Sequence, residues 1–517
     1  MTPASSCPPH VLRVYTPPGY VEERRWVLKV LFEEHLGYEL QWVEEAEPEV
    51  RRRLGDAEGR GLWRRSMLER EWTLLVTADD RALWLADGLF SLSPDRWLSA
   101  GSVPTTLRGE FSGNLDGGEN PLAVLFGEPL EIPDAASWKG ATYRDRDGAL
   151  WAAALPAEAS ATELPADLLC AADPLGAAFF WLSRYEERAL AQEDVFDLHG
   201  RFPADQSWMG RHGLLGRALV DEWADQLDHW LQKLGAAPRP SREYELELSH
   251  DVDHPLAGVG RGLTAMLRGS AGDLLAGEVV SAARRVGAWA TRSVSLDPYN
   301  TFDWLMERAE SVGQRAAFFF MAGATPGRPD GSYRLTDPFV LDVMREVHRR
   351  GHEIGLHPSY ETATDADLLG RELEALRSAA ATAGLALPQV LGGRQHYLRW
   401  RATQTWRQWA QAGLEYDSTL GFADVAGFRC GTCRPYTAFD LESGEPLALR
   451  EIPLVVMEVT LSSYQRLSWG QALESIEELG AVCRRHRGTM SLLWHNSSLG
   501  NAAARRCYAE AVKVLAP

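Results

Sequence analysis

Apolar runs and helical spacing alternate through the second half of the chain. Seven runs predict strands, at residues 244–248, 316–321, 353–356, 390–392, 414–416, 454–457 and 490–494. Between several of them, apolar residues recur at the spacing of an amphipathic helix, over residues 302–311, 338–349, 365–383 and 469–485. Repeated strand–helix units are typical of a parallel sheet. We therefore expect a deformed (β/α) barrel of about seven strands, with its chemistry at the carboxyl ends of the strands.

The first half of the chain has a different pattern, which predicts a separate α+β domain. Strands are expected at residues 10–15, 74–76 and 82–85, and helices at 21–36, 178–188 and 218–234. The Pro- and Gly-containing stretch 235–242 is typical of a linker. Because 517 residues exceed what one core usually holds, we predict domains at 1–237 and 243–517.

A helical insertion is expected around residues 258–295, inside the second domain. It carries several arginines among apolar residues. Three interpretations fit this pattern: a lid over a cleft, a helix on a membrane surface, or a helical excursion packed on the barrel.

Composition and charge exclude some classes of function. The 45% hydrophobic and 24% charged residues are typical of a soluble globular protein, and the formal net charge is −19. Such a charge opposes binding to nucleic acid or to an anionic membrane through bulk electrostatics. The sequence has no pattern of a secretion signal and no apolar run long enough to span a bilayer, so a cytoplasmic location is expected.

Polar clusters follow the predicted strands. After the first strand, Asp251 and Asp253 are two residues apart, so in an extended strand their side chains would share one face. One carboxylate could then hold a cation while the other acts as a base; the alternative is an ordinary turn or helix cap. Further clusters contain His357, Asp417 and His495, and the run from Arg394 to Arg399.

The order of these clusters resembles the polysaccharide deacetylase family, also called the NodB-homology family of carbohydrate esterases. His-Asp-Val-Asp at 250–253 resembles its Asp-containing first motif, and Gly-His-Glu-Ile-Gly-Leu-His at 351–357 is similar to its metal-binding segment. Arg-Gln-His-Tyr at 394–397 resembles its Arg-x-Pro-Tyr motif, and Leu-Trp-His at 493–495 its final motif. The resemblance covers roughly residues 243–500 and implies hydrolysis of an acetyl group on a sugar or glycan precursor.

The resemblance also implies roles for single residues. Asp251 would be the general base and His495 the general acid, with Arg394, Tyr397 and Asp417 completing the catalytic set. A divalent metal, with zinc expected, would lower the pKa of a bound water and polarise the acyl group.

The implied metal ligands are Asp253, His357 and Glu361. Glu361 stands where the family usually has a second histidine, four residues after the first. His254 or His396 could replace it, or the metal site could be degraded. In the last case the barrel would be an inactive protein that binds a glycan or a partner.

The first half of the chain contains a second resemblance. Residues 179–187, 199–203 and 220–223 are similar to an uncharacterised domain that precedes deacetylase-like domains in bacterial proteins. This resemblance implies an architecture and no activity.

Overall fold

The computed structural model divides into two compact units, each described here by itself. It describes residues 8–43, 48–50, 53, 70–111, 122–129, 142–144, 146–147, 149–155, 167–237, 242–275, 277–324, 327–331, 333–385, 390–402 and 404–517. Unit 1 comprises residues 1–193, 218–242 and 439–446, and unit 2 comprises 194–217, 243–438 and 447–517. Part of the predicted linker, residues 238–241, lies outside the described residues.

Unit 1 is built on a mixed seven-stranded sheet in the order β2-β1-β3-β4-β9-β8-β7. The strands are β1 (Val11–Tyr15), β2 (Glu39–Val43), β3 (Trp72–Val76), β4 (Ala82–Ala86), β7 (Thr142–Arg144), β8 (Leu150–Leu155) and β9 (Asp167–Cys170), and β5 (Gly109–Phe111) pairs separately with β6 (Leu122–Val124). The helices are α1 (Val21–Leu28), which continues as the π-helix η1 (Lys29–His35), η2 (Ala100–Ser102), α4 (Pro174–Leu182), α5 (Tyr185–Ala189) and α7 (Leu219–Lys233). The α+β elements expected in this half are thus present.

Unit 2 is built on a nine-stranded sheet in the order β15-β16-β14-β13-β12-β11-β10-β18-β17. Its strands are β10 (Glu245–Val252), β11 (Ala316–Met321), β12 (Glu353–His357), β13 (Gly392–Gly393), β14 (Tyr416–Asp417), β15 (Tyr436–Asp440), β16 (Glu445–Glu451), β17 (Val456–Met457) and β18 (Thr489–Leu493). Every pairing from β17 to β16 along this order is parallel. The mixed α/β class is confirmed, and among the described residues the hydrogen-bonded order is an open series that ends at β17 and β15.

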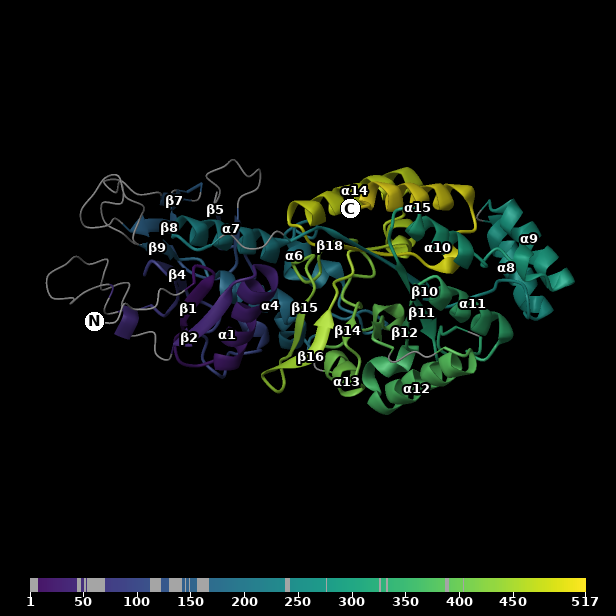
Figure 1. The fold of residues 1–517 in the computed structure, drawn as a ribbon, viewed down its shortest axis with the longest axis horizontal. Coiled ribbons are helices and arrows are strands. Elements are labelled where there is room, and N and C mark those ends of the chain that lie inside the picture. Colours follow the sequence, from purple (N-terminus) through teal and green to yellow (C-terminus); the bar gives the residue numbers. More distant parts are fainter. Residues whose placement is uncertain are drawn as a thin grey trace. The chain divides into compact units, whose positions relative to one another are not determined.

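Helices cover both sides of this sheet. The α-helices are α6 (Trp208–Arg211), α8 (Leu263–Leu275), α9 (Val279–Thr291), α10 (Phe302–Glu310), α11 (Pro338–Arg349), α12 (Ala366–Thr382), α13 (Thr405–Gln411), α14 (Trp469–Arg485) and α15 (Ala502–Leu515). Short helical turns are η4 (Ala204–Gln206), η5 (Val294–Leu296), η6 (Tyr360–Thr364), η7 (His396–Leu398), η8 (Thr460–Tyr464) and η9 (Asn496–Ser498). Within unit 2, α14 and α15 lie along one side, and α11, α12 and α13 lie on another (Figure 1).

The segment 194–217 belongs to unit 2 by its contacts, although the sequence pattern assigned it to the first domain. The Phe428 amide donates to the carbonyl of Leu215 at 2.8 Å, and the Ala204 amide lies 3.2 Å from a carboxylate oxygen of Asp424. These long-range contacts cannot be read from local periodicity. They bring a part of the chain that precedes the predicted linker to the same unit as the polar strand ends.

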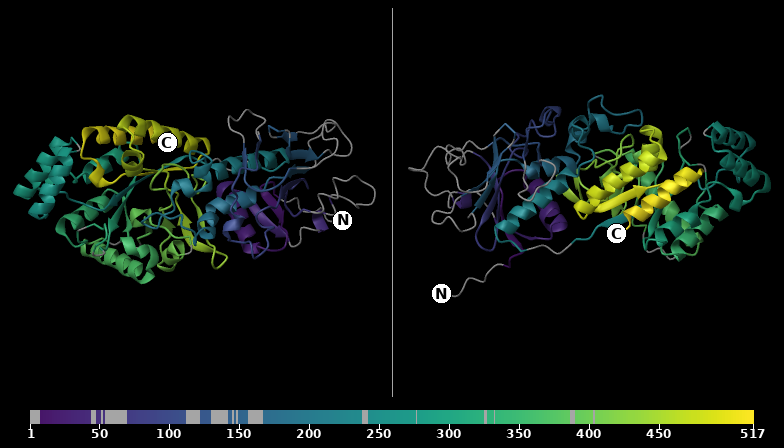
Figure 2. Two further views of the ribbon diagram at one scale, coloured as in Figure 1. Left: turned by 180° about the vertical axis from the view of Figure 1, so that it is seen from behind. Right: turned by 90° about the horizontal axis from the view of Figure 1, so that it is seen from above.

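The predicted insertion at 258–295 is a helical hairpin formed by α8 and α9. Figures 1 and 2 show the two helices at one end of unit 2, beyond α10 and α11. Among the described residues, no helix of the chain combines the length and hydropathy that a membrane span requires.

Asp297 fixes the base of the hairpin. Its buried carboxylate accepts three consecutive amides, at 257–259, with distances of 2.8 to 3.0 Å, and the Tyr299 amide at 3.1 Å. Replacing Asp297 by alanine leaves these amides without their acceptor. Hydrogen bonds to charged groups contribute about 1.5–3 kcal/mol each and are not additive.

We therefore expect Asp297→Ala to lower the free energy of unfolding of unit 2 by about 3 kcal/mol. The measurement is urea denaturation, together with faster hydrogen exchange of peptides that contain residues 257–259. Asp303→Ala is the matched control, because the Asp303 side chain is 76% exposed. Equal stability and equal exchange in the two variants would contradict this role for Asp297.

Candidate metal and catalytic site

The polar strand ends of unit 2 meet around one cavity. Because the strands are parallel, their carboxyl ends lie at the same edge of the sheet. The cavity has a volume of about 260 Å³. Its lining residues are Arg201, Asp251, Asp253, His357, His396, Tyr397, Leu398, Met457, Val459, Tyr464, His495, Ser497 and Ser498. Distant segments of sequence thus contribute to a single site within one unit.

Three acceptor atoms converge in this cavity: Asp253 Oδ1, His357 Nε2 and His396 Nδ1. His357 Nε2 lies 3.1 Å from Asp253 Oδ1 and 2.9 Å from His396 Nδ1, which is itself 3.5 Å from Asp253 Oδ1. Both imidazoles are buried, with side-chain exposures of 2% and 4%. The two histidines meet because of the register of the strands that precede them: Leu356 of β12 pairs with Gly393 of β13.

The far nitrogen of each imidazole fixes its tautomer. His357 Nδ1 lies 2.7 Å from the carbonyl of Arg394, and His396 Nε2 lies 3.1 Å from the carbonyl of Pro329. A carbonyl only accepts, so each far nitrogen carries the proton. In neutral imidazoles the two facing nitrogens then both present lone pairs, toward each other and toward a carboxylate.

This arrangement fits a divalent cation. Oriented imidazoles whose outer N–H groups bind carbonyls are typical of metal ligands. Ligands about 2.0–2.1 Å from a tetrahedral zinc ion are about 3.3 Å apart, close to the three separations in the cavity. Asp253 Oδ1 is also buried without a hydrogen-bond partner. Two histidines and one carboxylate, with room in the cavity beside them, form the donor set of a catalytic zinc site.

Without a metal, the repulsion between the facing lone pairs of His357, His396 and Asp253 could instead be relieved by a proton on His357. Burial lowers the pKa of this imidazole, but the carboxylates of Asp251 and Asp253 raise it above its ordinary value in total. Conversely, burial raises the pKa of Asp253, whereas the three neighbouring histidines lower it well below the usual range. The Asp253 carboxylate is therefore ionised and suited to bind either a proton donor or a metal.

The other proposed ligands lie elsewhere. Glu361 approaches Arg328 Nε at 2.5 Å and Arg399 Nη1 at 3.7 Å, and it does not belong to the converging group. His254 is outside the group as well, and burial lowers its pKa. Of the candidates for the third ligand, His396 is the one whose ring nitrogen the structure brings to Asp253 and His357.

Asp251 lies beside this group and is held by Arg394. The buried guanidinium donates from Nη1 to Asp251 Oδ1 and to Ser249 Oγ, each at 3.0 Å. It also donates from Nε to the carbonyl of Ser418 at 2.7 Å. Asp251 is thus fixed at the cavity wall, where it can accept a proton from a molecule in the cavity.

Asp417 is not a cavity-lining residue in the described part of the chain. Its carboxylate is fully buried and accepts a short hydrogen bond from Thr419. Burial raises the pKa of Asp417 to about 7, although Thr419 and Arg394 act in the opposite direction. Its contacts are those of a group that supports the loop after β14.

His495 occupies another wall of the cavity and is paired with Glu458. Its Nδ1 lies 2.7 Å from Glu458 Oε1, and its Nε2 lies 3.7 Å from Asp253 Oδ2. Burial lowers the pKa of His495, but Glu458 and the aspartates raise it to about 10 in total. Glu458 therefore orients the ring and favours its protonated form, with Nε2 facing the cavity.

The sequence pattern did not single out Glu458. It directly follows β17, the short strand that pairs with β18, so it lies next to the strand that leads to His495. The sequence did contain a signal for Glu458, because it is a carboxylate that directly follows a predicted strand. The other polar clusters of the site also follow predicted strands.

Tyr397 and Leu398 form a strained turn at the mouth of the cavity. Their φ angles are 63° and 52°, in the left-handed region that non-glycine residues rarely adopt. Arg201 contacts this turn: its Nη1 donates to the Tyr397 carbonyl at 3.3 Å, and its Nη2 to the Tyr464 hydroxyl at 3.2 Å. Asp197 holds the other side of the guanidinium at 2.7 Å.

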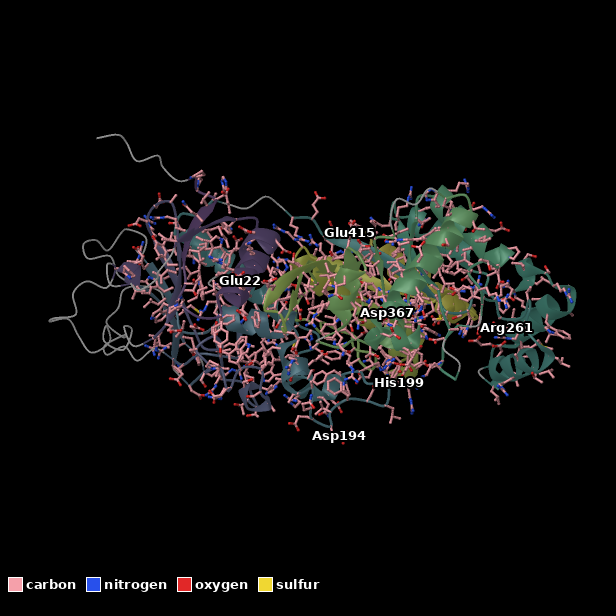
Figure 3. All side chains as sticks on the ribbon, turned by 90° about the horizontal axis from the view of Figure 1, so that it is seen from below. Glu22, Asp194, His199, Arg261, Asp367 and Glu415 are labelled. Atoms are coloured by element: carbon pink, nitrogen blue, oxygen red, sulfur yellow. The ribbon has the colours of Figure 1, made fainter. Side chains whose placement is uncertain are left out.

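The segment that supplies Arg201 was not expected at the cavity. Figure 3 labels Asp194 and His199 on this part of the chain. His199 Nδ1 lies 3.0 Å from the Tyr360 hydroxyl, and its carbonyl accepts from Arg399 Nε at 2.9 Å. Residues 199–203 form a recognisable motif in the sequence, but local spacing does not place them beside a strand end.

One family model matches part of the first half of the chain. The model of a family of unknown function (DUF7033) matches residues 125–236, which include the segment that contains Arg201. A search of curated proteins found no match.

Solved structures are similar over about half of the chain. A putative polysaccharide deacetylase from Mycobacterium smegmatis is 17% identical with a TM-score of 0.36, and Puue allantoinase is 16% identical with a TM-score of 0.35; each alignment covers 53% of this chain and 84% of the other. A mutant of a CE4 family pseudoenzyme with restored enzymatic activity is 11% identical with a TM-score of 0.28, over 55% of this chain and 68% of that one.

The converging donor atoms generate a prediction about metal binding. We expect the protein to bind one zinc ion. Loss of a residue that only hydrogen-bonds to a metal ligand typically weakens metal binding about 10- to 100-fold. Because His396 would be a ligand itself, His396→Ala should weaken zinc binding more, on the order of 10²-fold or more. Glu361→Ala is the matched control and should bind zinc as the wild type does. Titration against a competing chelator, with elemental analysis, measures both. Loss of zinc in the Glu361 variant with retention in the His396 variant would contradict this ligand set.

Proposed function

We propose that unit 2 is a metal-dependent deacetylase that removes an acetyl group, N-linked or O-linked, from a sugar or glycan precursor. One observation carries the proposal. A three-ligand metal cradle lies between a fixed carboxylate, Asp251, and an imidazole, His495, that is paired with Glu458, in a single cavity. Hydrolysis of an amide or ester needs a base on one side of the acyl carbon and an acid on the side of the leaving group.

Asp253, His357 and His396 would hold the metal. When bound, a divalent metal such as zinc supplies a Lewis acid that lowers the pKa of water and polarises a carbonyl. The donor set is mixed nitrogen and oxygen, which suits zinc and other imidazole-binding metals.

The chain's own groups would then move two protons. Asp251, oriented by Arg394, takes a proton from the attacking water as the oxygen–carbon bond forms. His495 gives its proton to the leaving nitrogen or oxygen as the bond from the acyl carbon breaks. The products are acetate and the free amine or alcohol. The Tyr397 amide, in the strained turn, would help to bind the developing oxyanion.

Aromatic side chains at the cavity support a sugar substrate. Tyr397 and Tyr464 line the cavity, and Tyr464 is 43% exposed. Trp400 and Tyr360, two neighbouring aromatic residues, are buried and do not line the cavity. Sugar rings commonly pack their apolar faces on tyrosines that keep a polar edge in water.

A direct assay tests the proposal. The zinc-loaded protein should release acetate from at least one member of a panel of N-acetylated and O-acetylated sugars. Asp251→Asn and His495→Ala should keep the metal and lose kcat by about 10²–10⁴-fold each, as for general acid–base groups. Thermal melting of each variant reports whether the fold is retained.

Two outcomes would overturn the proposal. A metal-loaded wild type that releases no acetate from the whole panel would favour the alternative, a glycan- or partner-binding protein without catalysis. Full activity in both metal-containing variants would show that the reaction occurs elsewhere in the chain.

Arg201 has a positioning role in this proposal, because it holds the Tyr397 carbonyl through a side chain fixed by Asp197. Arg201→Ala should lower kcat by up to about 10²-fold, as a displacement of about 1 Å in an active site can. KM, metal content and melting temperature should change little, and Arg201→Lys should recover part of kcat. Arg211→Ala, which removes an exposed arginine of the same segment, is the control. A loss confined to stability would contradict the positioning role.

A further inference from the structure

The outer face of the hairpin α8–α9 is unusually apolar. Thirteen large hydrophobic residues are exposed among the described residues, and eight of them lie between residues 263 and 296. They are Leu263, Leu267, Leu274, Leu275, Val279, Val280, Val286 and Leu296. A concentration of this kind marks an interaction surface rather than scattered exposure.

The most exposed of these residues surround the turn between the two helices. Leu275 is 91% exposed, Val280 71% and Val279 63%. They lie at the end of α8 and the start of α9, so they form an apolar tip. Along α8, Leu263 and Leu267 continue the stripe at a spacing of one helical turn.

The hairpin is held rigidly, so the tip is a fixed feature of the surface. Arg285 of α9 forms a two-pronged ion pair with Asp273 of α8, at 2.8 and 2.9 Å. Ser281 donates to the Gly500 carbonyl at 2.7 Å, and Asn501 donates to Glu278 at 2.8 Å. The base is fixed by Asp297, as described above, and Figure 3 labels Arg261 near the place where the hairpin begins.

The exposed charges within the hairpin's own stretch of sequence have one sign. Among the described residues from 258 to 296, the exposed charged side chains are Arg268 and Arg292. The two acidic groups of the same stretch, Asp273 and Glu278, are half-buried and already bound to Arg285 and Asn501. The chain as a whole has a net charge of −19, so a basic local surface runs against its average.

We propose that the tip and outer face of α8–α9 dock on an anionic lipid surface. The apolar tip would enter the interface between headgroups and acyl chains, as amphipathic helices do, while Arg268 and Arg292 would contact the headgroups. Charges elsewhere on the protein are screened beyond about 8–10 Å at physiological ionic strength, so the local arginines decide the sign of the interaction.

The shape of the surface favours lipid over a second copy of the chain. A stable protein interface needs about 800 Å² of complementary surface on each partner. Here α8 and α9 lie at one end of unit 2, beyond α10 and α11 (Figures 1 and 2). The most exposed residues flank the turn at the end of this pair of helices. Such an end inserts readily into a deformable phase and offers little flat area to a rigid partner. The proposal is independent of the proposed catalytic function.

Vesicle binding of the full chain tests this proposal. The protein should sediment with vesicles of an equal mixture of phosphatidylcholine and phosphatidylglycerol, and much less with phosphatidylcholine alone. Hydrogen exchange of peptides that cover residues 263–291 should slow in the presence of the anionic vesicles. Because Coulomb attraction is screened, binding should weaken as salt is raised.

Variants of the tip distinguish specific binding by this surface from nonspecific adsorption of the protein to vesicles. Leu275→Asn combined with Val280→Asn should reduce the bound fraction at least about 10-fold, since both side chains would leave the lipid phase. Leu198→Asn is the matched control, because Leu198 is fully exposed on a different segment. Arg268→Gln combined with Arg292→Gln should abolish the preference for anionic vesicles, whereas Arg349→Gln on α11 should not.

Three results would overturn the proposal. The first is that the wild type does not bind the anionic vesicles. The second is that the tip variant and the Leu198 variant bind equally well. The third is that the wild type self-associates in sedimentation velocity and the tip variant is monomeric, with no vesicle binding by either, which would make this face an interface between copies of the chain.

Discussion

The buried guanidinium of Arg394 is the interaction on which the site depends. A charge removed from water must be compensated by neighbouring groups, and here every partner belongs to the site or to the loops that carry it. Its side chain binds Ser249 and Asp251 of β10 and the carbonyl of Ser418. The centre of the Phe319 ring lies 5.1 Å from its guanidinium carbon. Its own carbonyl accepts the proton of His357 Nδ1.

One residue therefore determines two features of the cavity. Through its side chain, Arg394 sets the position of the Asp251 carboxylate. Through its backbone, it sets the tautomer of His357 and so directs the Nε2 lone pair into the cavity. A structural role and a chemical role are thus combined in a single buried cation, which explains why it is completely enclosed.

The sequence predicted most elements of unit 2 because their core faces are strongly patterned. The helices α11 (Pro338–Arg349) and α14 (Trp469–Arg485) begin and end at the predicted residues. The strands β15 and β16 were missed. In β16, the exposed positions are Glu445, Pro446, Ala448 and Arg450, whereas Leu449 and Glu451 are buried. This is the pattern of a partly solvated strand near the sheet edge, which apolar periodicity detects poorly.

The site was predicted less completely, for a geometric reason. Asp251, Asp253, His357 and His495 line the cavity, because each lies within two residues of the end of a strand. The third converging donor could not be chosen from spacing along the chain. His396 follows His357 by 39 residues, and only the register of β12 against β13 makes them neighbours. Arg201 and Glu458 reach the site through tertiary contacts of the same kind.

The path of the chain has a consequence for inheritance. The chain enters unit 2 at Asp194, leaves it at Ala218 and returns at Glu243. A genetic exchange at the apparent linker would combine one protein's strand ends with another protein's Arg201 and Asp197. Such a hybrid would mix two halves of one cavity wall, so recombination at this boundary should be selected against. The two halves of the gene are therefore expected to be inherited together, although the sequence pattern of each half is that of a separate domain.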